Sequence, residues 1–153
     1  MASEEKKNLE SILKPTLKSH GFRKKGGTWC RYFDNFIQVI NIQGSQWSKR
    51  FYLNLGVYIR ELGNKQWPAE YDCHVRVRLS TIADSELVHK LLNYEEDLED
   101  RSREKISEVV VEAGIPWLEK CSSIEGAKAE YTLPNRVITK WQRQLLDKFF
   151  AQS

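Results

Sequence analysis

The chain has 153 residues, with a hydrophobic fraction of 41% and a charged fraction of 29%, values that are ordinary for one globular domain. Five Trp, six Tyr and six Phe exceed what disordered chains usually carry, so we expect a packed fold. The formal net charge of +3 is too small to indicate a dedicated nucleic-acid binder by itself, because such domains carry a strongly basic face or stripe.

The start of the chain and its cysteines both point to the cytoplasm. The first residues are charged where a secretory signal would be apolar, and no apolar run approaches the roughly 20 residues of a membrane span. Cys30, Cys73 and Cys121 are widely spaced and form no Cys-x-x-Cys pair, which is typical of free thiols in a reducing compartment. We therefore expect a cytoplasmic protein without membrane association.

The first element that the pattern predicts is a helix over residues 4–19. Ser3 is a suitable N-cap residue, and Leu9, Leu13 and Leu17 follow at helical spacing. Pro15 should kink this helix or begin a second short one.

The pattern then changes to the period of β-structure. The predicted strands cover residues 28–33, 36–43, 50–60 and 73–80. In the third of them, Phe51, Leu53 and Leu55 alternate strictly with other residue types, which indicates a strand with one face in the core. The fourth strand alternates in the same way, with Val75 and Val77 as its apolar positions.

The remainder of the chain is predicted to be helical. The expected helices cover residues 85–93, 101–113, 116–121 and 135–151, with Gly114 ending the second of them. The apolar stripe expected for the last helix is Val137, Ile138, Trp141, Leu145 and Phe149. Strands and helices that fall in separate runs favour one α+β domain over residues 1–153. We expect an antiparallel sheet of about four strands, with the N-terminal helix and the C-terminal helices packed mainly on one face.

Signatures of common catalytic and cofactor sites are absent from the sequence. There is no G-x-G-x-x-G, no phosphate-binding loop motif and no G-x-S-x-G, and the three His residues lack the spacing of a helical zinc site. Cys73 beside His74 is not a nucleophile–base pair in a strand, because adjacent side chains point to opposite faces. We therefore expect no cofactor, no metal ion and no catalytic residue, and favour a non-catalytic protein over an enzyme.

The second face of the predicted sheet offers the best candidate site. Tyr52, Asn54 and Tyr58 share a face of one strand, and His74, Arg76 and Arg78 share a face of another. If these strands are neighbours, the combined surface is aromatic, amide-bearing and cationic, and Gln43 and Trp47 rim it. Arginine can bind carboxylate or phosphate through its two-pronged guanidinium, and tyrosine can stack on planar groups. An ordinary solvated sheet face is the alternative interpretation.

Several short segments resemble one family. Gly21-Phe22-Arg23-Lys24-Lys25-Gly26 is such a segment, and others lie at residues 28–32, 39–43, 53–58, 73–79 and 114–118. Together they resemble an uncharacterised bacterial family, domain of unknown function 4304. The resemblance implies a bacterial cytoplasmic α+β domain, and it implies no reaction and no catalytic residues. Stand-alone proteins of this genre include immunity partners of toxins.

Three functional hypotheses follow, in order of preference. The first is a binding module, of the accessory or immunity type, that uses the polar sheet face to bind another protein with an anionic surface, such as a toxin. The second is an enzyme acting on a small anionic substrate in a cleft near His74 and Arg76, with His74 as acid or base. The third is single-stranded nucleic-acid binding, with Tyr52 and Tyr58 stacking on bases and the basic run at residues 23–25 on phosphates.

Overall fold

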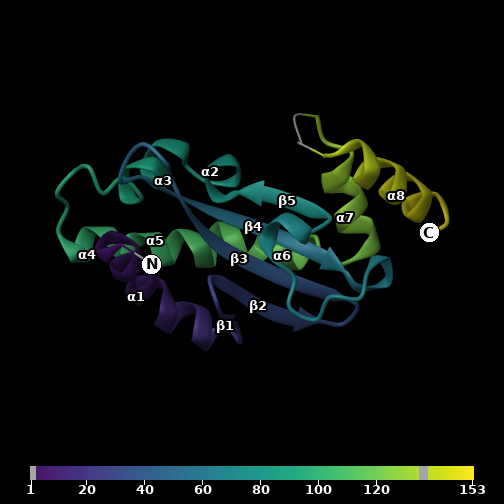
Figure 1. Cartoon of the computed structure of the whole chain (residues 1–153), viewed down its shortest axis with the longest axis horizontal. Coiled ribbons are helices and arrows are strands. Elements are labelled where there is room, and N and C mark those ends of the chain that lie inside the picture. The colour runs from purple at the N-terminus through teal and green to yellow at the C-terminus, as the bar shows by residue number, and fades with distance from the viewer. Residues whose placement is uncertain (1–2, 135–137) are drawn as a thin grey trace.

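A five-stranded antiparallel sheet forms the centre of the computed structural model, which describes residues 3–134 and 138–153 (Figure 1). The strands are β1 (Arg23–Lys25), β2 (Thr28–Phe33), β3 (Phe36–Gly44), β4 (Phe51–Ile59) and β5 (Val75–Arg78). They lie in the order of the chain, and each pairs antiparallel with the next. The architecture is α+β as expected, with five strands where about four were expected.

The additional strand is β1, which the sequence pattern did not predict. Its three residues are all charged and exposed, so they show none of the alternation by which a strand is recognised. A two-residue turn, Gly26-Gly27, connects β1 to β2, and Gly26 has φ of 63°, a left-handed conformation that glycine adopts without strain.

The helices come before and after the sheet, with α1 at the start of the chain. They are α1 (Glu4–Ser19), α2 (Leu79–Ile82), α3 (Ser85–Leu91), α4 (Asp100–Arg103), α5 (Lys105–Val109), α6 (Ile115–Lys120), α7 (Ile124–Tyr131) and α8 (Lys140–Ala151). None of the helices within the described residues combines the length and apolar character needed to cross a membrane. Two one-turn 3₁₀ helices, η1 (Arg60–Leu62) and η2 (Glu70–Asp72), lie between β4 and β5.

Helix α1 begins at its predicted cap and runs past its proline. The Ser3 hydroxyl accepts a hydrogen bond from the backbone N–H of Lys6 at 3.1 Å, which satisfies one of the free donors at a helix start. Pro15 lies inside the helix and on its exposed side, and the helix continues to Ser19. Leu9, Leu13 and Leu17 form the buried face of α1.

The helical segment from α5 to α6 is continuous, so the expected end at Gly114 was wrong. Between α5 and α6 lies η3 (Val110–Gly114), a single π-helical stretch, and Gly114 itself has helical angles of φ −70° and ψ −54°. Pro116 follows directly. Because proline has no N–H and its ring crowds the carbonyl four residues earlier, a widened turn before it lets the helix axis continue.

The last part of the chain differs from its sequence-based description in two respects. Helix α7 was not predicted, since its buried residues include the small Ala127 and the charged Glu130 as well as Tyr131. Helix α8 begins at Lys140, while residues 135–137 of the expected helix, Val137 among them, lie outside the described residues. The buried residues of α8 are Leu146 and Phe150, and Trp141 of the expected stripe is exposed.

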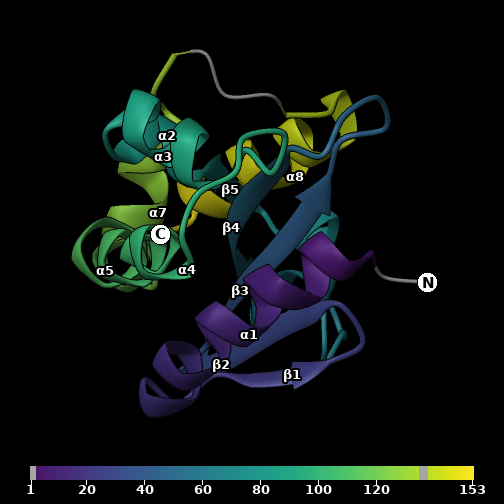
Figure 2. The same ribbon diagram turned by 90° about the vertical axis from the view of Figure 1, so that its left-hand side faces the viewer.

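The two faces of the sheet are covered differently. The helix face carries the main core, in which Leu53, Leu55 and Val57 of β4 pack with residues of α1, α5 and α6 (Figure 2). The opposite face, which we call the polar face, carries a second and smaller cluster. Residues 60–73, here termed the covering segment, pack over part of the polar face through that cluster and leave the rest open.

Candidate functional site

One row of side chains crosses all five strands on the polar face. Strand pairing places Lys25 beside Thr28, Thr28 beside Asn41, Asn41 beside Asn54 and Asn54 beside Arg78. Residues that pair across an antiparallel sheet point to the same side. The register therefore sets a lysine and an arginine at the two ends of a row whose middle is formed by hydroxyl and amide groups.

The side chains of this open part contact one another. The Asn54 amide donates to the Asn41 carbonyl oxygen at 3.2 Å and to that of Gln43 at 2.9 Å. The guanidinium of Arg78 lies 4.0 Å from the centre of the Tyr52 ring, a cation–π arrangement. Gln43 and Arg78 are exposed, and Tyr52 is half-buried. Gln43, Tyr52 and Arg78 thus form one connected surface, and Asn54, which is only 7% exposed, hydrogen-bonds within it and offers little area to a partner.

Trp47 lies in the loop between β3 and β4, close in sequence to both Gln43 and Tyr52. Its side chain is 91% exposed, an unusual state for the largest apolar side chain. It therefore offers apolar area to solvent in the loop that connects β3 and β4.

The other part of the polar face lies beneath the covering segment. There Cys30, Val39, Tyr58 and Cys73 form the smaller hydrophobic cluster, against which Trp67 packs. The backbone carbonyl of Pro68 lies 3.9 Å from the Cys30 sulfur. This part of the face is consequently a second core and offers little surface to a partner.

Gly56 lies in the middle of β4, where the missing side chain leaves the backbone open to close approach. In the structure, the space above it is taken by the protein itself: a Cβ atom at Gly56 would lie 2.7 Å from the Cys73 sulfur. The glycine therefore accommodates the covering segment.

His74 and Tyr58 lie at the closed end of the face, with exposed fractions of 7% and 4%. Their ring centres are 4.8 Å apart, and the backbone N–H of Ile59 donates to Nδ1 of His74 at 2.9 Å. Burial lowers the pKa of His74 to about 4, so its imidazole is neutral at physiological pH. With Nδ1 engaged by the backbone, this histidine is poorly placed for acid–base chemistry on a substrate.

Arg76 lies at the border between the covered and the open parts. Its Nε donates to Oε1 of Glu70 at 3.0 Å and its terminal nitrogen donates to Oε2 at 2.9 Å, a two-pronged pair with a carboxylate of the covering segment. The hydrogen bonds to Glu70 raise the pKa of Arg76. Both prongs of this guanidinium are therefore already used inside the protein.

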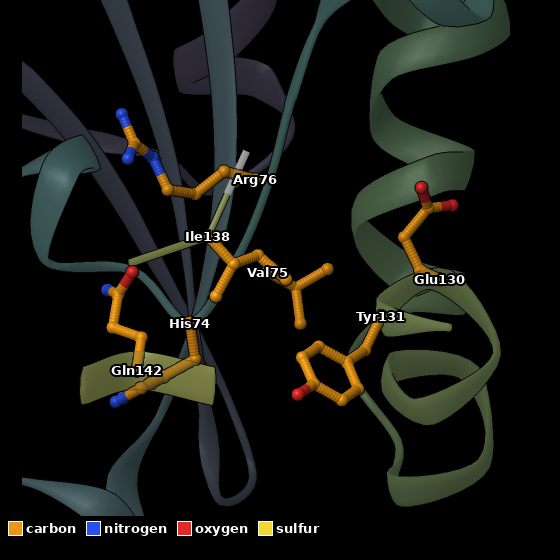
Figure 3. A pocket seen from close by; sticks show the side chains of 7 residues that line it. All are labelled: His74, Val75, Arg76, Glu130, Tyr131, Ile138 and Gln142. Carbon is orange, nitrogen blue, oxygen red and sulfur yellow. The ribbon is translucent and has the colours of Figure 1, made fainter. Parts of the chain in front are cut away.

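The cavity beside His74 and Arg76 has a volume of only about 10 Å³, room for roughly one water molecule (Figure 3). It lies between β5 and the α7–α8 region and is lined by His74, Val75, Arg76, Glu130, Tyr131, Ile138 and Gln142. Figure 3 shows the Tyr131 ring directed toward Val75, while the Arg76 guanidinium points away from both Tyr131 and Glu130. Within the described residues, this cavity is too small for the anionic substrate considered from the sequence.

The cysteine thiols give no sign of reactivity. Cys30, Cys73 and Cys121 are all buried. Burial raises the pKa of Cys30 to about 12 and also raises that of Cys73, so both stay protonated thiols at neutral pH. The part of the chain that the structure describes contains no group of three His, Cys, Asp or Glu side chains that could hold a metal ion.

Three residues of the open face, Lys25, Thr28 and Asn41, were not assigned to this face from the sequence, where Lys25 was considered only as part of the basic run at residues 23–25. Asn41 and Gln43 alternate with Ile40 and Ile42, and this alternation was a usable signal for a polar side of β3. Lys25 had no such signal, because its position follows from the pairing of an unpredicted strand.

Comparison with known proteins supports the resemblance noted in the sequence. The family model described as "Domain of unknown function (DUF4304)" matches residues 13–120, a segment that contains all five strands and therefore the whole polar face. Searches of curated proteins and of solved structures find no match. The chain belongs to the DUF4304 family.

Proposed function

We propose that this protein is a non-catalytic binding module that uses the open part of its polar face to hold another protein with an anionic surface. The observation that carries the proposal is the cross-strand row, which sets Lys25 and Arg78 at opposite ends of an amide-bearing surface. A toxin with an acidic surface is a partner of this kind. A bacterial origin and a cytoplasmic setting belong to the same proposal.

The composition of this surface suits a protein partner. Protein interfaces are enriched in Tyr, Trp and Arg, and their central residues commonly anchor in the opposing surface. Because the Arg78 side chain is already stacked on Tyr52, it loses less conformational entropy when it binds a carboxylate. The hydrogen-bonded amides of Asn41, Gln43 and Asn54 form an ordered polar floor.

The size of the face indicates which neighbouring residues take part. Five strands at spacings of about 4.8 Å make the row about 19 Å long. A row that is one side chain wide covers less than the ~800 Å² that each partner buries in a standard interface. The partner must therefore also contact the loop at residues 45–50, and Trp47 is the apolar anchor available there.

Base stacking receives less support from the same geometry. Tyr58 is buried, and the ring of Tyr52 is covered on one side by Arg78. Neither tyrosine offers the free ring on which single-stranded nucleic acid is usually stacked.

The test is charge reversal at the two ends of the row. Lys25→Glu combined with Arg78→Glu should abolish the capture of a partner by cross-linking and pull-down from source cells. Lys105→Glu combined with Lys128→Glu is the control, because it makes the same change in net charge at exposed positions elsewhere, and it should leave capture unchanged. The captured protein is then purified and titrated by calorimetry against all three proteins. Equal affinity for the wild type and the Lys25/Arg78 variant would refute the proposal.

A further inference from the structure

A second surface, separate from the polar face, lies between α1 and the first hairpin of the sheet. It is a groove of about 580 Å³ lined by Lys7, Glu10, Ser11, Lys14, Lys18, Lys24 and Trp29. Figure 2 shows α1 lying beside β1 and β2 on the helix side of the sheet. Trp29 is almost fully buried, so the accessible wall of the groove is mainly lysine and serine.

Helical geometry aligns three of these lysines. At about 100° per residue, Lys7, Lys14 and Lys18 fall within about 40° of one another around the axis of α1. At about 1.5 Å per residue, they extend along about 16 Å of the helix. Lys24 reaches the same groove from β1, because it pairs with Trp29 and thus points to the helix side of the sheet.

Little negative charge balances this row. Glu10 is the one carboxylate that lines the groove, and it forms an ion pair with Lys24. Lys7 lies 3.9 Å from the exposed Glu4. Lys14 and Lys18 form no salt bridge with any residue that the structure describes, so the groove presents uncompensated positive charge at its centre.

Folding accounts for this arrangement only in part, since Lys18 lies in the last turn of α1, where the helix dipole favours a cation. Like charges four residues apart, as in Lys14 and Lys18, destabilise a helix by a few tenths of a kcal/mol. The buried side of α1 is formed by other residues, the leucines, which would pack equally well with neutral side chains at the lysine positions. The packing of α1 therefore does not require lysine at these positions, and their charge is available to a ligand.

We infer that this groove binds the phosphate backbone of single-stranded nucleic acid. A lysine ammonium is a compact point charge that suits phosphate oxygens, and the groove residues include no exposed aromatic side chain of the kind that anchors protein interfaces. A straight row of ammonium groups fits a linear polyanion, and the absence of an exposed ring among the groove residues means contact with the backbone without reading bases. The groove and the polar face consist of different residues, so each of the two proposals can be refuted without affecting the other.

The experiment measures fluorescence anisotropy of a labelled 12-nucleotide oligo(dT) with the full-length protein between 25 and 200 mM NaCl. Phosphate contacts by the three aligned lysines, Lys7, Lys14 and Lys18, predict a slope of log K against log [NaCl] of about −2, since each phosphate contact on a single strand contributes about −0.7. Lys14→Gln with Lys18→Gln should reduce the slope to about −0.7 and weaken binding at 50 mM NaCl at least about tenfold.

Lys105→Gln with Lys128→Gln removes the same net charge at exposed positions away from the groove and should bind like the wild type. Arg78→Glu, on the polar face, should also bind like the wild type, and inorganic polyphosphate should displace the oligonucleotide. The inference is overturned if oligo(dT) does not bind at 25 mM NaCl, if both lysine pairs weaken binding equally, or if polyphosphate binds but the oligonucleotide does not.

Discussion

Cys73 packs its sulfur directly onto the backbone of Gly56. A Cβ atom added to Gly56 would lie 2.7 Å from both the Cβ and the sulfur of Cys73, closer than side chains in proteins approach one another. Because of this contact, the covering segment packs closely against the polar face. Gly56 therefore lies at the border between the covered and the open parts of that face.

We expect Gly56→Ala to destabilise the protein by about 1–3 kcal/mol, because overpacking a well-filled site forces the covering segment away from β4. Urea unfolding followed by tryptophan fluorescence measures the change. Gly44→Ala is the matched control, since its added Cβ would have only ordinary contact with Phe51 at 3.6 Å. Equal effects of the two substitutions would contradict the close contact at Gly56.

The lowered pKa of His74 should make the stability of the protein depend on pH. Its pKa is lowered in the folded protein to about 4 from an ordinary 6.5, so the unfolded chain binds more protons between these values. Stability is therefore complete above the unfolded pKa and declines as the pH falls from 6.5 toward 4. Between pH 7 and pH 5 we expect a loss of about 2 kcal/mol from this residue.

Other groups titrate in the same pH range, so the contribution of His74 is measured as the difference between the wild type and a variant without this histidine. His74→Asn keeps an acceptor near the position of Nδ1 but cannot be protonated, and it should lose about 2 kcal/mol less than the wild type between pH 7 and pH 5. Unfolding free energies from urea titrations at the two pH values provide the comparison. Parallel losses in the two proteins would show that His74 titrates normally.

Arg103 is a cation with an exposed fraction of only 3% that is held by backbone groups. Its guanidinium donates to the carbonyl oxygens of Leu91 and Glu96, each at 2.8 Å, and to that of Asn93 at 3.2 Å, and it lies 3.7 Å from the centre of the Tyr94 ring. It thus holds in place the loop at residues 92–99 that follows α3.

Arg103→Met should destabilise the protein by about 2–4 kcal/mol, because it leaves buried carbonyls without donors. Hydrogen exchange should rise most in residues 93–99. Arg101→Met, at an exposed position in the same helix, should change stability by less than about 0.5 kcal/mol. A loop that exchanges as slowly in the Arg103 variant as in the wild type would disprove this role.

The sequence predicted the features that local alternation encodes. In β4, the alternation of Phe51, Leu53 and Leu55 with Tyr52 and Asn54 defined the two faces of the sheet, because successive strand residues point to opposite sides. The same rule brought Asn54 and Arg78 to one face, and the pairing of β4 with β5 makes them neighbours.

Features that depend on long-range contacts could not be predicted in this way. The segment after β4 contains Gly63, Asn64 and Pro68 and therefore has the composition of any surface loop. Its position over the sheet depends on partners far away in sequence, such as the hydrogen bond from the Tyr32 hydroxyl to the Gln66 carbonyl. The burial of Tyr58 and His74 follows from this packing and not from their own strands.

Buried polar groups on the helix face could not be predicted from the sequence for the same reason. Gln38 is fully buried between sheet and helices, where it accepts from Arg31 at 2.7 Å and donates to Ser122 at 2.9 Å. Ser122 is 84 residues away along the chain, so no local pattern connects it with Gln38.

The last prediction concerns the pair that closes the covering segment, Glu70 and Arg76. The side chain of Arg76 is 38% exposed, so solvent screening should limit the coupling in a double-mutant cycle to about 1 kcal/mol despite the two-pronged geometry. Glu70→Gln and Arg76→Gln, alone and together, supply the cycle, with unfolding free energies measured in urea.

Each single change should also speed proteolytic cleavage within residues 60–73, because the segment then opens more often. The exposed ion pair of Lys65 with Asp72, 3.0 Å apart in the same segment, is the matched control, and Lys65→Gln should change cleavage less than Arg76→Gln. If the cycle gives no coupling and cleavage is unchanged, the ion pair does not hold the segment, and the packing of Cys73 on Gly56 and of Trp67 on the smaller cluster holds it to the sheet.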